Sequence, residues 1–245
     1  MKILSASVST TTFSRAYLQR AWEQRNTLAE YERNGFAQFV YLTITGHLEA
    51  SMVELMNRRI MYARSVLSPM RAGNCRWGEK AEAPSVPTRP IHDSLMSLLA
   101  HFDRKIDKAA LDGLIELFQD VFAVKLTDLL AESHQYLKAL ASLRNVFAHG
   151  RDFWIAFGQD DQNALSLGRN PLQLPAQRLL AANVLTTLHF DAWTHPDFQK
   201  AFFSDAAMLY FLGKARHIEA LLKTVLTFDP EKEVPLMVAL PDLLA

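Results

Sequence analysis

The sequence predicts an all-α protein, a helical bundle with a small β-hairpin insertion and a helical C-terminal extension. Apolar residues recur at spacings of three and four along most of the chain, as they do on the buried face of a helix. The 245 residues are 49% hydrophobic and 21% charged, which supplies enough apolar surface for one substantial core. Strand-like patterning is confined to one short stretch after residue 152. We expect residues 1–151 to form the bundle, and residues 152–245 to pack on the same domain.

Two long helices open the predicted bundle. Apolar spacing predicts the first over residues 14–34, with a Ser or Thr cap at its start and a stop at Asn34–Gly35. It predicts the second over residues 36–68. Gly46 lies in the middle of that second helix and costs about 1 kcal/mol relative to Ala, so we expect a bend or a close helix contact there.

A long loop is predicted over residues 69–90, because prolines and glycines interrupt the helical spacing. The loop carries four basic side chains and two glutamates. A loop of this length is often functional, and a disordered strap is the alternative. Both interpretations stay open from the sequence.

Helical spacing returns after this loop and again after the predicted hairpin. The hairpin is expected from the apolar residues 153–157 and 164–167, which flank a polar turn. Trp154 within the first strand could stack on a base, and ordinary core packing is the alternative. The further helices are predicted over residues 92–101, 108–130, 133–149, 175–192, 196–203 and 205–228.

Composition limits the function classes. The 26 basic and 26 acidic residues cancel, so a nucleic-acid partner must be held by a local basic cluster. The single cysteine, Cys75, cannot form an internal disulfide, which favours a reducing compartment. No apolar run approaches the roughly 18 residues that span a bilayer. The eight histidines form no HExxH motif, and the chain has no Walker A loop. We expect a cytoplasmic protein with no membrane partner, no metal site and no cofactor.

The informative stretch runs from Leu143 to Arg151, at the end of the predicted helix 133–149. At about 100° per residue, Asn145 and His149 share a face that points away from the predicted buried face. Arg144 lies on the flank, and its long side chain can reach toward them. Three polar groups are therefore expected on the side of the helix that the core leaves free.

These groups suit metal-independent RNA cleavage. An imidazole can take and return a proton near neutral pH, and a guanidinium matches phosphate oxygens and stabilises charge that develops on them. Asn145 would orient a partner through its amide. The ribose 2′-OH would attack the neighbouring phosphate, giving a 2′,3′-cyclic phosphate and a 5′-hydroxyl. The alternative is an ordinary helix C-terminus, with His149 near the negative end of the helix dipole and Gly150 as the left-handed cap.

Arg144-Asn145-x3-His149 in a helical protein resembles the Arg-x4–6-His signature of HEPN domains, in which Asn commonly follows the Arg. The resemblance extends over about residues 13–151 and implies a bundle of four or five helices with the motif on a late helix. It implies a homodimeric endoribonuclease of a toxin–antitoxin or antiviral defence system, with Arg144, Asn145 and His149 as catalytic residues. RNA and an antitoxin or inhibitor protein would be its partners. Because some members have lost activity, a helical module that binds a protein or nucleotide is the alternative.

A second match involves Glu54, Arg58 and Arg59. Their spacing resembles the Glu-x3-Lys-Arg of some HEPN families, with Arg in place of Lys. Under the resemblance these residues would support the site, and Arg58 together with Arg151 would contact RNA. The alternative is an ordinary surface ion pair between Glu54 and Arg58, worth a few tenths of a kcal/mol.

Overall fold

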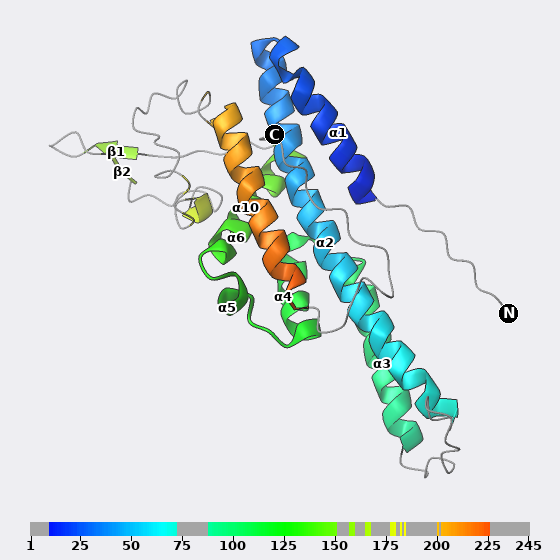
Figure 1. The fold of residues 1–245 in the computed structure, drawn as a ribbon. Coiled ribbons are helices and arrows are strands. Elements are labelled where there is room, and N and C mark those ends of the chain that lie inside the picture. Colours follow the sequence, from blue (N-terminus) through cyan, green and yellow to red (C-terminus); the bar gives the residue numbers. More distant parts are fainter. Residues whose placement is uncertain are drawn as a thin grey trace.

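The computed structural model describes residues 10–72, 88–150, 157–159, 165–167, 177–179, 182, 184, 200 and 202–225. Helices dominate this part of the chain, so the predicted all-α class is confirmed at that level (Figure 1). The helices are α1 (Thr10–Gln24), the 3-10 turn η1 (Arg25–Thr27), α2 (Glu30–Ala72), α3 (Thr88–Ile106), α4 (Leu111–Phe122), α5 (Leu126–Leu130), α6 (Ser133–Ala148) and α10 (Asp205–Lys223).

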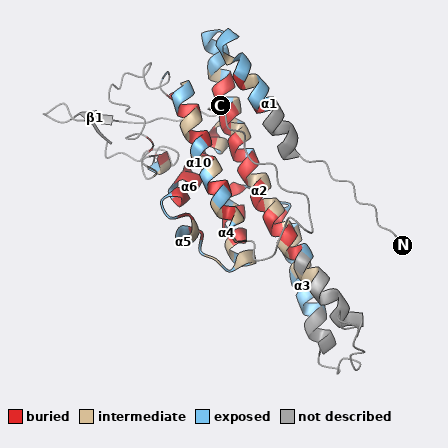
Figure 2. Cartoon of the chain, in the orientation of Figure 1, coloured by how far each residue is buried: buried red, intermediate tan, exposed pale blue. Residues whose placement is uncertain are grey.

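Helix α2 is the centre of the bundle, and α1, α3, α4, α6 and α10 all pack against it. In Figure 1, α10 lies beside the first half of α2 and α3 lies beside its last half. Figure 2 shows buried residues along most of α2 and along α10. Tyr41 of α2 is fully buried, and its hydroxyl donates to the Phe202 carbonyl at 2.6 Å. One contiguous core therefore joins the early helices to α10.

The predicted helix stop at Asn34–Gly35 is wrong. Helix α2 begins at Glu30 and continues through both residues, and the break lies earlier, at η1. Glu32 explains the new start, because its carboxylate accepts the Ala29 N–H at 2.7 Å, as the third helical residue does in a capping box. A buried run that begins at Phe36 then holds the helix against the core despite Gly35.

Of the bend or close helix contact expected at Gly46, the close contact is wrong. Gly46 lies in the interior of α2, is exposed to solvent, and a Cβ placed on it would meet no atom within 4 Å. The helix runs on to Ala72, and α3 begins at Thr88, so both ends of the predicted loop 69–90 are helical. Residues 73–87 lie outside the described residues.

The predicted helix 108–130 is divided into α4 and α5. Ala123 follows α4 with φ of 54°, in the left-handed region, although it is not a glycine. The Gln119 side-chain oxygen accepts the Leu126 N–H at 3.1 Å, which gives an acceptor to the first amide of α5. A side-chain contact thus stabilises a break that has no glycine or proline signal.

Two three-residue strands, β1 (Phe157–Gln159) and β2 (Leu165–Leu167), pair antiparallel with Phe157 opposite Leu167. The remaining residues of the predicted hairpin lie outside the described residues, as does most of the predicted helices 175–192 and 196–203. Helix α10 begins at the predicted residue 205, where the Ser204 hydroxyl accepts the Ala207 N–H at 3.2 Å. In the part of the chain that the structure describes, no helix is long and apolar enough to cross a membrane.

Candidate functional site

Helix α6 presents the faces that its sequence predicts. Tyr136, Leu140 and Leu143 are buried in the core, and Phe147 is partly buried and stacks on Tyr41 with ring centroids 5.7 Å apart. Asn145 and His149 are exposed. The core therefore fixes the rotation of α6 and leaves the polar residues of the motif on its outer side.

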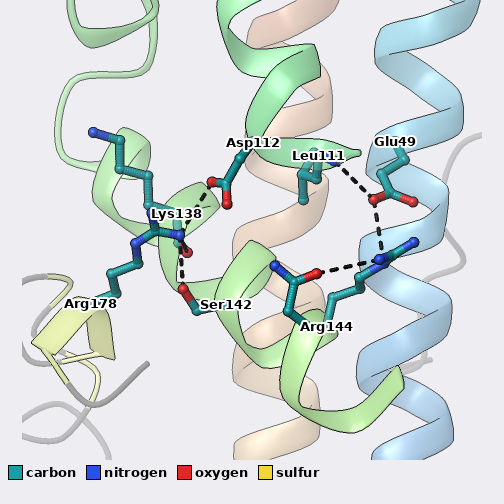
Figure 3. A network of polar contacts seen from close by, with 8 residues as sticks. Glu49, Leu111, Asp112, Lys138, Ser142, Arg144 and Arg178 are labelled. Carbon is teal, nitrogen blue, oxygen red and sulfur yellow. Dashed lines mark hydrogen bonds and ion pairs between the residues drawn. The ribbon is translucent and has the colours of Figure 1, made fainter. Parts of the chain in front are cut away.

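Arg144 lies between α6 and α2. Its Nε is 3.5 Å from Oε1 of Glu49 on α2, and its Nη1 donates to the Asn145 side-chain oxygen at 3.3 Å (Figure 3). The side chain of Arg144 is 32% exposed and that of Glu49 is 20% exposed. The guanidinium is therefore held on one side by a half-buried carboxylate and on the other by the neighbouring amide, and part of it still reaches solvent.

Glu49 also contacts α4. The same Oε1 accepts the Leu111 N–H at 3.2 Å, so the carboxylate satisfies the first amide of α4 (Figure 3). A negative charge is favourable at a helix N-terminus, where the amides carry the positive end of the dipole. Glu49 thus connects three helices, and the position of Arg144 depends on the α4 terminus as well as on α6.

His149 is the C-cap residue of α6, directly after Ala148. Gly150 follows it with φ of 57°, and the Gly150 N–H bonds to the Phe147 carbonyl at 3.2 Å. This is the left-handed glycine cap that the alternative interpretation predicts. Among the described residues, no hydrogen bond or ion pair to the exposed imidazole is present. The glycine cap of α6 and an exposed imidazole therefore occur at neighbouring residues.

Hydrogen bonds do not join all three residues of the motif. Arg144 donates to Asn145, and no hydrogen bond within the described part of the chain joins His149 to either of them. On a regular helix, His149 lies about 40° around the axis from Asn145 and about 6 Å further along it. The imidazole and the amide thus lie one above the other on the same exposed face, with the guanidinium to one side.

Arg178 contacts α6 at residues that precede Arg144 in the chain. Its Nη1 donates to the Ser142 hydroxyl at 2.8 Å and to the Lys138 carbonyl at 3.2 Å, and pairs with Asp112 at 3.2 Å (Figure 3). These contacts attach the segment around residue 178 to α4 and α6. They stabilise the surface beside the motif. Because Nη1 of Arg178 is engaged in these intramolecular contacts, its role is structural.

Glu54 and Arg58 form the predicted i,i+4 pair, with Arg58 Nε 2.8 Å from the carboxylate. Arg58 is 7% exposed, so the pair is half-buried and not an ordinary surface pair. Within one chain the two residues do not join Arg144. By helical geometry they lie roughly 140° and 180° around α2 from Glu49, and Arg58 is about 14 Å further along the axis.

Arg59 and Arg151 are the other two predicted supporting residues. Arg59 is partly exposed on α2, about 15 Å along the axis from Glu49. Arg151 lies outside the described residues. The structure therefore brings together Arg144, Asn145 and Glu49, and keeps Arg59 apart from them in the single chain.

A titratable group with a strongly lowered pKa, Glu219, lies in the core between α2 and α10. Burial alone would raise the pKa of Glu219, but its contacts with His47 at 3.4 Å and Lys223 at 2.9 Å outweigh burial and lower it to about 2. The carboxylate is 4% exposed. This group therefore stabilises the fold and is out of reach of a substrate.

A metal site is not formed by the described residues, which contain no group of three or more His, Cys, Asp or Glu side chains placed to hold an ion. Comparison with known proteins finds no matching family model, no similar curated protein and no similar solved structure. The resemblance to HEPN domains therefore stays a prediction, and it depends on the motif residues.

Glu49 is the site residue that the sequence does not reveal. It lies 95 positions before Arg144, and no short spacing connects the two. The signal available was weak: a single carboxylate follows Leu48 near the centre of a long helix. Only the packing of α2 against α6 shows which cation it meets.

Proposed function

We propose that the protein is a metal-independent endoribonuclease whose motif residues Arg144, Asn145 and His149 act on RNA. The observation that carries the proposal is the guanidinium of Arg144, held by Glu49 and Asn145 at the exposed edge of α6. The exposed imidazole of His149 lies about 7.5 Å further along the axis and about 140° around it, at the same end of the helix. The cleavage of a phosphodiester requires a cation that stabilises the phosphate and a group that transfers protons, and this end of α6 carries one of each.

The reaction follows from the roles of these groups. The imidazole takes the proton of the ribose 2′-OH while the 2′-oxygen bonds to phosphorus. The bond from phosphorus to the 5′-oxygen breaks, and that oxygen must receive a proton. Arg144 stabilises the negative charge that grows on the phosphate oxygens. The products are a 2′,3′-cyclic phosphate and a 5′-hydroxyl, and DNA is not cut because it lacks the nucleophile.

A homodimer is part of this proposal. The 2′-oxygen and the leaving 5′-oxygen lie on opposite sides of phosphorus in an in-line attack, so two proton-transfer groups are needed at once. One chain supplies one His149. Two copies that face each other across a cleft would supply one imidazole to each side of the phosphate.

The direct test incubates single-stranded RNA with the protein in EDTA and analyses the product ends. We expect cyclic phosphate ends, and a rate that falls by a factor of about 10² to 10⁴ in His149→Ala and in Arg144→Ala. His217→Ala and Arg104→Ala are the matched controls, since both residues are exposed on other helices. Gel filtration checks that the variants keep the oligomeric state.

Three outcomes contradict the proposal. Wild-type protein that leaves RNA intact, even after separation from any bound inhibitor, would refute the nuclease. Equal loss of cleavage in the His217 control would show that the effect is not specific to the motif. A partner protein that is lost only in the His149 variant, with RNA uncut throughout, would indicate the non-catalytic module.

A further inference from the structure

A pocket of about 460 Å³ lies where the α1–α2 junction meets the start of α10. Its volume falls in the range of small-molecule sites, which is about 300–1,000 Å³. The described lining combines an apolar floor, including Phe36 and Phe203, with a charged rim. Such a lining offers contacts both to a ring and to a charged group of a ligand.

The rim carries three cations and two carboxylates. Arg25 pairs with Asp205 at 2.8 Å and lies over the Trp22 ring at 4.0 Å, so it is used in joining η1 to α10. Arg33 and Lys200 are both exposed, and within the described part of the chain neither has an ion pair. Glu30 is the remaining carboxylate of the described rim. Two cations are therefore available for an anion that enters the pocket.

The pocket lies at the same end of the bundle as the motif. Phe203 of the pocket is 6.3 Å, centroid to centroid, from Phe147 of α6, and His149 follows Phe147 by two residues. Phe147 in turn stacks on Tyr41 of α2. A single aromatic contact thus separates the pocket wall from the end of α6 that presents the imidazole.

We propose that this pocket holds a nucleotide of the single-stranded RNA substrate, with its phosphate at Arg33 and Lys200 and its base against Phe203. The inference rests on the proposed nuclease function and assigns a substrate subsite to it. Aromatic rings stack on any base, and exposed cations bind phosphates without sequence preference. The subsite would therefore orient the strand without reading its sequence.

The test measures binding of a fluorescein-labelled 2′-O-methyl oligouridylate to the full chain by anisotropy over a range of salt concentrations. This RNA has no free 2′-hydroxyl, so it cannot be cut, and the measurement does not depend on nuclease activity. In Arg33→Ala/Lys200→Ala, we expect affinity to fall at least about tenfold, as for the loss of charged hydrogen bonds. The slope of log affinity against log salt should fall by about 0.7, because the two cations hold one phosphate and each neutralised phosphate of a single strand contributes about 0.7.

Lys105→Ala/Lys125→Ala is the matched control, because it removes two exposed cations that do not line the pocket. We expect a much smaller loss of affinity there. Glu30→Gln should strengthen binding, because it removes a carboxylate from the rim. Phe203→Leu should weaken binding about tenfold while the salt slope stays unchanged, since stacking involves no counterion.

Equal affinities of the pocket and control double variants would overturn the subsite, as would wild-type protein that does not bind the oligonucleotide. The two proposals fail separately. Protein that binds through the pocket but leaves natural RNA intact refutes the nuclease alone. Protein that cuts RNA, and whose binding is unchanged in the pocket variant, refutes the subsite alone.

Discussion

Replacing Glu49 by alanine tests whether this carboxylate stabilises the packing of the three helices that it connects. One carboxylate oxygen of Glu49 accepts the Leu111 N–H at 3.2 Å and lies 3.5 Å from Nε of Arg144. The substitution removes both contacts together. The first amide of α4 then loses its side-chain acceptor, and Arg144 loses the negative charge beside it.

The expected loss in the free energy of unfolding follows from these two contacts. Loss of a side-chain acceptor at a helix N-terminus costs about 1 kcal/mol. The ion pair joins side chains that are 20% and 32% exposed, so it adds about 0.5 kcal/mol. We expect Glu49→Ala to lower the free energy of unfolding by about 1.5 kcal/mol. Glu49→Gln keeps an oxygen for Leu111 and loses only the charge, so it should cost about 0.5 kcal/mol.

Urea unfolding followed by circular dichroism measures both values, with unchanged m-values as the sign that the compactness of the end states is unchanged. Glu116→Ala is the control, because Glu116 is an exposed carboxylate of α4, and its loss should stay within about 0.5 kcal/mol. An alanine variant no less stable than the Glu116 control would refute the role of Glu49. Equal costs for alanine and glutamine would show that the charge matters and the hydrogen bond does not.

Two further predictions concern stability. Gly46→Ala should stabilise the protein by about 1 kcal/mol in urea unfolding, because the position is exposed, helical and open to a Cβ, whereas Gly150→Ala should destabilise by a similar amount, because its φ is 57°. A change of the free energy of unfolding in the same direction in both variants would contradict these two predictions. The pKa of Glu219 falls from 4.5 to about 2 because His47 and Lys223 outweigh its burial, so its contribution is complete above pH 4.5 and is lost as the pH falls toward 2. As the pH is lowered between these values, the Tm of Glu219→Gln should therefore fall less than the Tm of the wild type. Parallel falls in Tm would refute this role of Glu219.

The sequence predicts α6 well because the relevant signal is local. Residues spaced three and four apart share a helix face whatever surrounds them, and the buried positions Tyr136, Leu140 and Leu143 follow this rule. The exposure of Asn145 and His149 follows from the same periodicity. Candidate residues on one helix can therefore be assigned to a face before any tertiary contact is known.

The junction of α1 and α2 shows where local signals compete. Gly35 is a typical helix stop, but α2 continues through it because the residues that follow are buried and stabilise the helix. The actual break at η1 is stabilised by side chains of Arg25 and Thr27, which donate to the carbonyls of Trp22 and Gln24. Such contacts satisfy the last carbonyls of α1, and no glycine or proline marks them.

The sequence does not show which residues of different helices come into contact. Glu49 and Arg144 meet because α2 and α6 run antiparallel, as the contact of Tyr41 with Phe147 also shows. The same packing separates Glu54 and Arg58 from the motif, although their spacing resembles a supporting signature. A resemblance in spacing therefore fixes which residues share a helix face, and the packing of that helix decides what the face meets.

The zero net charge of the chain constrains how any RNA could be held. Without a broad positive surface, affinity must come from a few cations in fixed places together with contacts that involve no charge. Arg144 beside Glu49, and Arg33 with Lys200 at the aromatic pocket, are cations of this kind at neighbouring parts of the bundle. An enzyme built in this way would bind through a small number of phosphates, so its discrimination between RNA and DNA would come from the 2′-hydroxyl in the reaction and not from binding.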